Sequence, residues 1–290
     1  MTAMPSHPRS HHPPAVLRPG TRVRAGSSPR RGFTLLELLI VVAVMAIIAG
    51  AAIVLLGETE TRAQQHLATS EIGELKKALL RFREDTGYFP TQGPFNLDSR
   101  AGGFVPQANL PDYVASGAEI AWFDCPANFW QLFENPLTED RNGNGVLDSG
   151  EDTNGNSTID TFHSLGVWNP DAGRGWHGPY LSRTGNGYVR VGASLLTTGA
   201  GSPTTGTAIN DVVGVADPFE KSPVTATLYL QWRTAPTVVE SALSRWGRPY
   251  LLLDVTVPNS TRLMSMGANG TYESSASATA GDDVAVFLLR

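Results

Sequence analysis

The distribution of apolar and polar positions divides the chain into three parts, and the first is a long apolar run. From Leu35 to Leu56 there are 22 residues with a single charge, Glu37, and a single glycine. As a helix this run spans about 33 Å at ~1.5 Å per residue, enough to cross the hydrocarbon core of a bilayer. Two arginines precede the run and two glutamates follow it. By the positive-inside rule, residues 33–57 are predicted to span a membrane with the N-terminus in the cytoplasm.

Residues 58–88 form the second part, in which charged residues surround one apolar stripe. The stripe recurs at spacings of four, three, four and three, as on one face of an amphipathic helix. Its members are Ala68, Ile72, Leu75, Leu79 and Phe82. We expect this helix to continue the membrane helix, to lay its stripe on a globular domain and to end at Gly87. A coiled-coil seam is the alternative, but the stripe is short and Leu80 lies off it.

Residues 89–290 form the third part, which is rich in turn residues and contains short β-rich runs. These runs are 188–192, 225–233, 249–257 and 283–289. They predict a mainly antiparallel β-sheet against the long helix, and therefore an α+β fold. The Thr-, Gly-, Ser- and Pro-rich stretch 193–224 is predicted to be a long surface loop.

The charge and the cysteine content of the chain exclude several kinds of partner and site. Residues 1–32 contain six arginines and no acidic residue, whereas the remaining chain has 16 basic and 27 acidic residues, a net charge of −11. Such a chain offers no patch for neutralising phosphates, so we expect no nucleic-acid partner. Cys125 is the single cysteine, which excludes an intrachain disulfide and a zinc site built on several cysteines.

The carboxylate of Glu37 separates three interpretations of the apolar run. A Sec signal peptide would be cleaved near Ala49–Ala52, but the run continues to Leu56 and a charge lies in its first turn. A plain signal anchor would carry Glu37 at a cost of about 2.5–3.5 kcal/mol. An intramembrane carboxylate is therefore treated as functional by default.

Cleavage after Gly32 is the third interpretation, and it gives this carboxylate a role. Phe33 then becomes the first residue and carries a new α-amino group. In a bundle of such helices, the ammonium group of one subunit can approach Glu37 of its neighbour. This pairing offsets much of the desolvation cost and sets the axial register of the helices. Gly32 places no side chain in the way of a peptidase.

The stretch GFTLLELLIVVAVMAII (32–48) resembles the class III signal of type IV pilins and type II secretion pseudopilins. The resemblance implies that residues 1–32 are a leader removed by a prepilin peptidase, and that Phe33 is N-methylated. Many family members have proline at mature position 22, where this chain has Val54. We therefore expect a straighter helix at that position.

Five further segments follow in the order found in the major pseudopilin of type II secretion, its G-type core subunit. They are FREDTGYFPTQG (82–93), GPYL (178–181), RWGRPYLLL (245–253), MSMGANG (264–270) and DDVAVF (282–287). Compared with that family, residues 98–173 and 184–243 look like insertions. The resemblance implies a pilin-like fold with residues 89–290 as a periplasmic globular domain.

A calcium loop is predicted within the first insertion, because DRNGNGVLDSGE (140–151) fits the twelve-residue EF-hand pattern. The candidate ligands at positions 1, 3, 5, 7, 9 and 12 are Asp140, Asn142, Asn144, Val146 through its carbonyl, Asp148 and Glu151. Gly145 allows the sharp turn at position 6. A half-copy at 152–160 lacks glycine at position 6 and has His163 at position 12, so it is predicted to extend the first site. A solvated polar turn is the alternative.

A second calcium site is implied by the family, whose major pseudopilin holds Ca²⁺ in a loop near the C-terminus. The matching positions here are Met266 through its carbonyl, Asn269, Asp282 and Asp283. Asn269 replaces the usual aspartate and lowers the ligand charge. A polar turn before the last strand is the alternative.

Enzymatic motifs are absent from the sequence. The segment GRGWHG (173–178) matches a dinucleotide pattern, but no apolar strand precedes it and a proline follows it. The chain is therefore predicted to be a non-enzymatic subunit of the type II secretion pseudopilus. A type IV pilin or minor pseudopilin is the near alternative. A secreted calcium-binding or hydrolytic domain, released by signal peptidase, is the distant one.

The predicted location is the bacterial inner membrane, with a single span and the C-terminal domain in the periplasm, followed by a filament after assembly. The predicted partners are further copies of the chain, other pseudopilins, the inner-membrane assembly platform and the prepilin peptidase.

Overall fold

The computed structural model describes residues 33–182, 187–191, 208–219, 230–233, 235–236, 246–247, 249–270, 272–275 and 278–290. For residues 52–58, 230–233 and 246–247 it describes the backbone alone. The leader 1–32, with Gly32, lies outside the described residues, as do parts of the predicted strand 225–233 and of the predicted loop 193–224. Contacts divide the chain into two units, Met1–Ile53 and Val54–Arg290, and each is described by itself.

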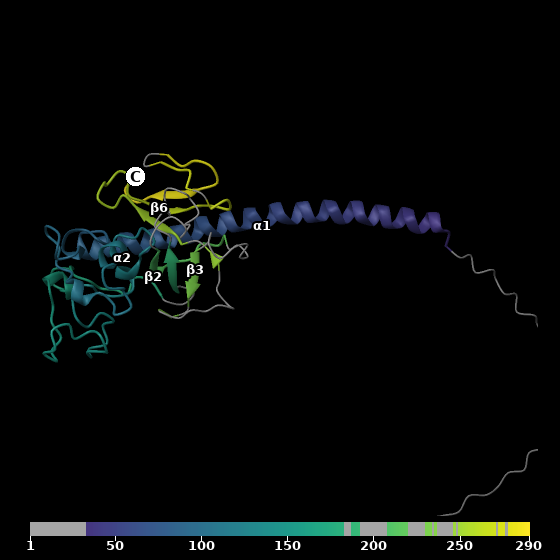
Figure 1. Ribbon diagram of the computed structural model, residues 1–290. Coiled ribbons are helices and arrows are strands. Elements are labelled where there is room, and N and C mark those ends of the chain that lie inside the picture. Colours follow the sequence, from purple (N-terminus) through teal and green to yellow (C-terminus); the bar gives the residue numbers. More distant parts are fainter. Residues whose placement is uncertain are drawn as a thin grey trace, which may run out of the picture. The chain divides into compact units, whose positions relative to one another are not determined.

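Helix α1, Leu35–Thr86, is 52 residues long and covers the two predicted helical segments except for residues 33–34 and 87–88 (Figure 1). Its backbone remains helical through Val54, in agreement with the lack of a proline there. The helix ends where Gly87 adopts a φ of +87°, a conformation that favours glycine, and the Gly87 N–H donates to the Arg83 carbonyl at 2.7 Å. Gly87 therefore terminates the helix, as predicted.

In the unit Met1–Ile53, the described residues belong mainly to the first part of α1. The large apolar side chains between Leu35 and Ile48 are 48–82% exposed. Among the residues whose side chains are described, no helical segment combines the length and the hydropathy of a membrane span.

In the unit Val54–Arg290, the predicted stripe of α1 is buried. Ala68, Ile72, Leu79 and Phe82 are fully buried, and Leu75 is 3% exposed. The ring of Phe82 makes edge contacts with Phe95 and Tyr180, whose centroids lie 4.9 and 5.3 Å away. The stripe thus packs within the chain, as predicted, and does not form a coiled-coil seam.

Short helices and seven strands follow α1 in the described part of the chain. The helices are η1 (Gly93–Phe95), η2 (Gln107–Asn109), α2 (Glu119–Phe123), η3 (Trp130–Leu132) and η4 (Ser164–Gly166). The strands are β1 (Gly187–Val191), β2 (Ile209–Gly214), β3 (Leu230–Arg233), β4 (Trp246–Gly247), β5 (Leu251–Leu253), β6 (Arg262–Ser265) and β7 (Val284–Phe287).

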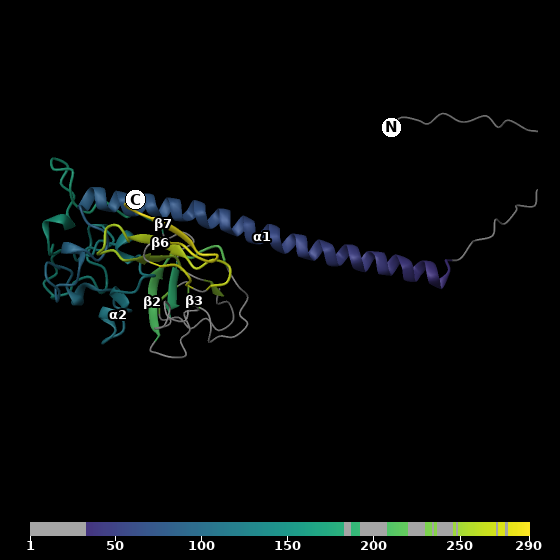
Figure 2. The same cartoon turned by 90° about the horizontal axis from the view of Figure 1, so that it is seen from above.

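These strands form two antiparallel sheets, one ordered β2-β1-β3-β4 and the other β5-β6-β7. The second sheet lies beside α1 (Figure 2), where Lys76 Nζ donates to the Phe287 carbonyl at 2.8 Å. Between them the Tyr250 hydroxyl donates to Glu71 Oε2 at 2.6 Å. A helix packed on antiparallel sheets confirms the predicted α+β fold.

Strands β4 and β6 lie where no strand was predicted, and two further details of the strand prediction are wrong. Strand β2 lies inside the stretch 193–224, which was predicted as loop because glycine, serine and threonine surround it. Its residues Val212 and Val213 are buried, so tertiary packing outweighs that composition. The predicted strand 249–257 stops at Leu253, because Asp254 adopts a φ of +54° and a turn follows.

Candidate functional sites

The loop 140–151 brings most of its predicted calcium ligands together. The carboxylate of Asp140 accepts the N–H groups of Asn144 and Gly145 at 3.0 and 2.8 Å. The side-chain amides of Asn142 and Asn144 both donate to Asp148 Oδ2, at 2.6 and 2.8 Å. Gly145 has a φ of +79°, which explains why glycine stands at the turn. The two amides and one carboxylate thus converge on a single point.

The side chain of Glu151 joins the two ends of this loop. It is 3% exposed, its Oε1 accepts the Arg141 N–H at 3.1 Å, and its Oε2 accepts the Asp148 N–H at 3.0 Å. Val146 is 59% exposed, and its N–H donates to Asn144 Oδ1 at 2.7 Å. The glutamate predicted at position 12 therefore spans the loop from position 2 to position 9.

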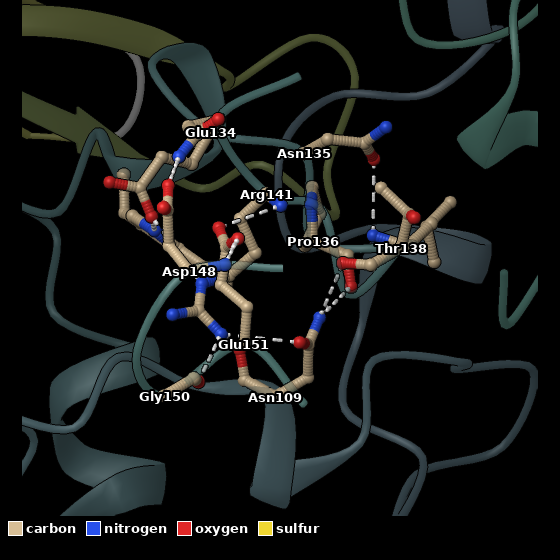
Figure 3. Close-up of polar contacts among 12 residues, drawn as sticks. Asn109, Glu134, Asn135, Pro136, Thr138, Arg141, Asp148, Gly150 and Glu151 are labelled. Carbon is tan, nitrogen blue, oxygen red and sulfur yellow. Dashed lines mark hydrogen bonds and ion pairs between the residues drawn. The ribbon is translucent and has the colours of Figure 1, made fainter. Parts of the chain in front are cut away.

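Arg141 fixes the loop to the domain (Figure 3). One terminal nitrogen, Nη1, donates to the Gly150 carbonyl at 3.0 Å and to Asn109 Oδ1 at 3.3 Å. Nε lies 3.7 Å from Glu134 Oε2. Asn109 Nδ2 in turn donates to the carbonyls of residues 136 and 138, at 3.1 and 3.0 Å. The base of the loop is therefore held by buried polar contacts, while its tip is exposed.

The C-terminal loop also gathers its predicted residues. Asn269 N–H donates to Asp282 Oδ2 at 2.7 Å, and Asp283 Oδ2 accepts the N–H groups of Glu273 and Ser274 at 2.9 and 2.7 Å. The Met266 carbonyl accepts a hydrogen bond from the Gly270 N–H at 3.1 Å.

Two buried oxygen atoms in this loop lack a hydrogen-bond partner among the described residues, Oδ1 of Asp282 and Oδ1 of Asp283. Buried carboxylate oxygens normally have partners, so these two atoms are candidates for contact with a cation. Sequence reasoning missed Glu273, whose Oε2 accepts hydrogen bonds from Asn269 Nδ2 at 3.1 Å and from the Asp282 N–H at 3.3 Å. The Ser- and Ala-rich surroundings of Glu273 give no pattern that marks it.

Among the residues that the structure describes, no group of three or more carboxylate, imidazole or thiol side chains is placed so that it could hold a metal ion. A calcium ion in either loop would therefore need amide and carbonyl oxygens in addition to carboxylates, and Ca²⁺ accepts oxygen ligands of all three kinds.

At the N-terminal end of α1, Glu37 takes part in a capping box. Thr34 donates its backbone N–H and its hydroxyl to Glu37 Oε2, at 2.9 and 3.0 Å. The Glu37 N–H donates back to Thr34 Oγ1 at 3.2 Å. This reciprocal arrangement satisfies two helix-end donors and fixes the start of the helix at Leu35. Sequence reasoning missed it, although the Thr-x-x-Glu spacing signals it.

The residues just before and after this cap are apolar and exposed, Phe33 by 87% and Leu35 by 82%. A continuous apolar surface follows with one charge near its beginning. Residues 27–53 match the prokaryotic N-terminal methylation motif. No curated protein and no solved structure gives a significant match to the chain.

The methylation motif is the N-terminal signal of type IV pilin-like and pseudopilin precursors, which a prepilin peptidase processes before assembly into a pilus or pseudopilus. The matched segment includes Gly32, Phe33 and Glu37, the residues predicted for processing and assembly. The chain therefore carries the signal of a membrane-anchored precursor that later joins a filament.

Proposed function

We propose that this chain is a structural subunit of a type II secretion pseudopilus, of the major-pseudopilin type. The observation that carries the proposal is the exposed apolar first part of α1, which has a single carboxylate near its start and coincides with the methylation motif. A surface of this size on an isolated chain requires a partner. The lipid bilayer covers it before assembly, and neighbouring helices cover it in the filament.

Processing and assembly follow from the chemistry of the first residues. The precursor lies in the bacterial inner membrane with its domain in the periplasm, and the peptidase cuts between Gly32 and Phe33. The described contacts of Glu37 use Oε2, which leaves Oε1 for the amine of Phe33 in a neighbouring subunit. Growth of the filament from the assembly platform, together with other pseudopilins, then drives protein export. The chain supplies no catalytic step.

The mass of the mature protein tests this proposal directly. Intact mass and N-terminal sequencing of protein from the membrane fraction should show a chain that begins at N-methylated Phe33. A soluble chain that begins near Ala51 would instead identify a secreted domain released by signal peptidase.

A deletion strain separates pseudopilin from pilin. Loss of exoproteins from the medium, without loss of surface pili, is expected for a pseudopilus subunit. Loss of surface pili with normal export would favour the near alternative, a type IV pilin. Normal export and normal pili would argue against both.

We further propose that the loops at 140–151 and 266–283 each hold structural Ca²⁺. The gathering of the Asn142, Asn144 and Asp148 side chains in the first loop and the two unpartnered buried oxygens of the second support this assignment. Chelation should lower the melting temperature of the full chain in detergent, and added Ca²⁺ should restore it, because an ion that binds only the folded state stabilises that state. Equal melting temperatures with and without Ca²⁺ would rule the assignment out.

A further inference from the structure

Asparagine followed by glycine is a chemically reactive pair, because the backbone nitrogen of the glycine can attack the side-chain amide of the asparagine. Glycine obstructs this attack least, since it has no Cβ. The described pairs are Asn142-Gly143, Asn144-Gly145, Asn154-Gly155 and Asn269-Gly270. Asn186, which also precedes a glycine, lies outside the described residues. Each described pair is therefore a candidate for deamidation.

The hydrogen bonds of the glycine N–H groups distinguish these pairs. Three of the groups donate to an acceptor that holds the peptide group in place. The acceptors are Asp140 Oδ2 for Gly145 at 2.8 Å, Asp152 Oδ1 for Gly155 at 2.7 Å and the Met266 carbonyl for Gly270 at 3.1 Å. The N–H of Gly143 donates no hydrogen bond to any residue that the structure describes. Its nitrogen is therefore free to turn towards Asn142.

Asn142 and Asn154 form a matched comparison, because both are exposed and both are followed by Gly-Asn. Each Nδ2 donates to an aspartate six positions later at 2.6 Å, and each Oδ1 accepts the N–H two positions later at 2.9 Å. The φ angles of Gly143 and Gly155 are +73° and +74°. The two pairs thus share their described side-chain contacts and differ in the glycine N–H.

The carbonyl oxygen of Asn142 is also placed for the reaction. Negative charge develops on Oδ1 when a nucleophile attacks Cγ, and a hydrogen-bond donor at this oxygen stabilises that charge. The Asn144 N–H donates to Asn142 Oδ1 at 2.9 Å and supplies this stabilisation. Asn142 therefore combines a stabilised oxygen with a nucleophile that no hydrogen bond restrains, whereas Asn154 has the first feature only.

We propose that Asn142 is a site of spontaneous deamidation and reacts faster than the other described Asn-Gly pairs. The Gly143 nitrogen loses its proton to hydroxide and forms a bond to Asn142 Cγ. The bond between Cγ and Nδ2 then breaks, and Nδ2 takes a proton from water and leaves as ammonia, which regenerates hydroxide. Water opens the resulting succinimide at either carbonyl and gives aspartate or isoaspartate. This inference depends on neither the calcium assignment nor the filament role.

The reaction changes a contact within the loop. Asn142 Nδ2 donates to Asp148 Oδ2 at 2.6 Å, so either product places a second carboxylate beside that of Asp148. Residues 139–160 already contain six acidic side chains and one arginine. As the protein ages, we expect the loop to gain one negative charge and to lose this contact, while Asn144 Nδ2 still donates to Asp148 at 2.8 Å.

Ageing of the full chain tests the proposal. The detergent-purified protein is incubated with chelator at mildly alkaline pH in heavy-oxygen water, so that the label marks deamidation during the incubation. Peptide mass spectrometry then gives the rate at each asparagine. Asn142 should react about tenfold faster than Asn154 or more, because the Gly155 N–H must first break a hydrogen bond to a carboxylate. Equal rates, or a faster reaction at Asn154, would overturn the proposal.

The urea-unfolded chain is the control for local sequence. Without the fold, Asn142 and Asn154 should react at similar rates, since both precede Gly-Asn. If the preference for Asn142 persists in urea, it comes from the neighbouring residues Arg141 and Thr153, and the role of the glycine hydrogen bonds is disproved.

Two matched variants test whether the glycine nitrogen is the nucleophile. Gly143→Ala and Gly155→Ala each add a methyl group at a position with nothing within 4 Å of the new Cβ, and circular dichroism checks their folding. Gly143→Ala should suppress the reaction at Asn142 and leave the slow reaction at Asn154 unchanged, and Gly155→Ala should do the reverse. If Gly143→Ala leaves the rate at Asn142 unchanged and the product is aspartate alone, water attacks the amide directly and the proposed mechanism is wrong.

Discussion

The two ends of α1 differ in whether their apolar side chains are exposed or buried. Near its start, Leu39 is 58% exposed, and every large apolar neighbour between Leu35 and Ile48 is exposed to a similar degree. Near its end, Leu79 is fully buried in a stripe with polar residues on the other faces. An amphipathic stripe needs one packed surface, which the chain itself provides, whereas a helix that is apolar on all faces needs partners on all sides. The first part of α1 is therefore built for lipid and for other subunits.

Matched substitutions of leucine give the largest expected difference between these two regions. Leu79→Ala should lower the free energy of unfolding of the domain by about 2–5 kcal/mol, because it leaves a cavity in the core. Leu39→Ala should change it by less than about 0.5 kcal/mol, because its side chain is exposed. Urea unfolding in detergent, followed by tryptophan fluorescence, measures both. Equal effects would mean that the first part of α1 packs on the domain after all.

The contact between α1 and the second sheet is expected to give the next largest change in the free energy of unfolding. Burial raises the pKa of the Tyr250 hydroxyl well above its ordinary value, so the group remains a donor to Glu71 at 2.6 Å. Tyr250→Phe should cost about 1–2 kcal/mol, since Glu71 Oε2 loses a partner in a partly buried position. Urea unfolding of this variant checks the value. Tyr88→Phe, at a residue that is 36% exposed, serves as a comparison for the loss of one tyrosine hydroxyl.

Sequence patterns predicted the parts of this molecule that depend on local periodicity. The stripe from Ala68 to Phe82 was found because its period of 3.6 residues is local. Strand β2 was missed because its local sequence resembles a loop. It becomes a strand through pairing with β1 and through the burial of Val212 in the core, and neither contact is local in the sequence.

The residues of the candidate sites also fall into those that local spacing predicts and those that only the fold brings together. The candidate ligand positions of 140–151 follow a fixed spacing, so the sequence alone could predict them. Glu139 accepts a hydrogen bond from the N–H of Asp160, 21 positions later, next to the antiparallel bridge between residues 138 and 161. A contact between residues so far apart leaves no periodic pattern in the sequence. The repeated Glu-Asp pair at 139–140 and 151–152 was nevertheless a signal that could have revealed it.

Cys125 lies in the core that the stripe helps to form, and its thiol predicts how the stability of the domain depends on pH. Burial raises the pKa of the Cys125 thiol to about 12, mainly because a thiolate there would be desolvated. Below pH 9 the thiol is neutral in both states and its contribution to stability is complete. Between about pH 9 and 12 the unfolded chain loses this proton and the folded chain keeps it, so stability falls by up to about 1.4 kcal/mol per pH unit. Cys125→Ala should remove this share of the decline in urea unfolding at pH 9–11, whereas an unchanged decline would show that the thiol ionises in the folded state.

The smallest expected effect concerns the cap at the start of α1, and it distinguishes two roles of Glu37. Thr34→Ala removes the capping box and should cost the helix end about 0.5–1 kcal/mol, seen as a small loss of helicity by circular dichroism in detergent. Glu37→Gln keeps a residue that can serve in a capping box but removes the charge that would pair with the amine of Phe33. If pairing between subunits sets the register, Glu37→Gln abolishes incorporation into filaments and Thr34→Ala does not. If both variants assemble normally, the cap is the main role of the carboxylate. The exposed apolar surface would then direct assembly without a charged contact.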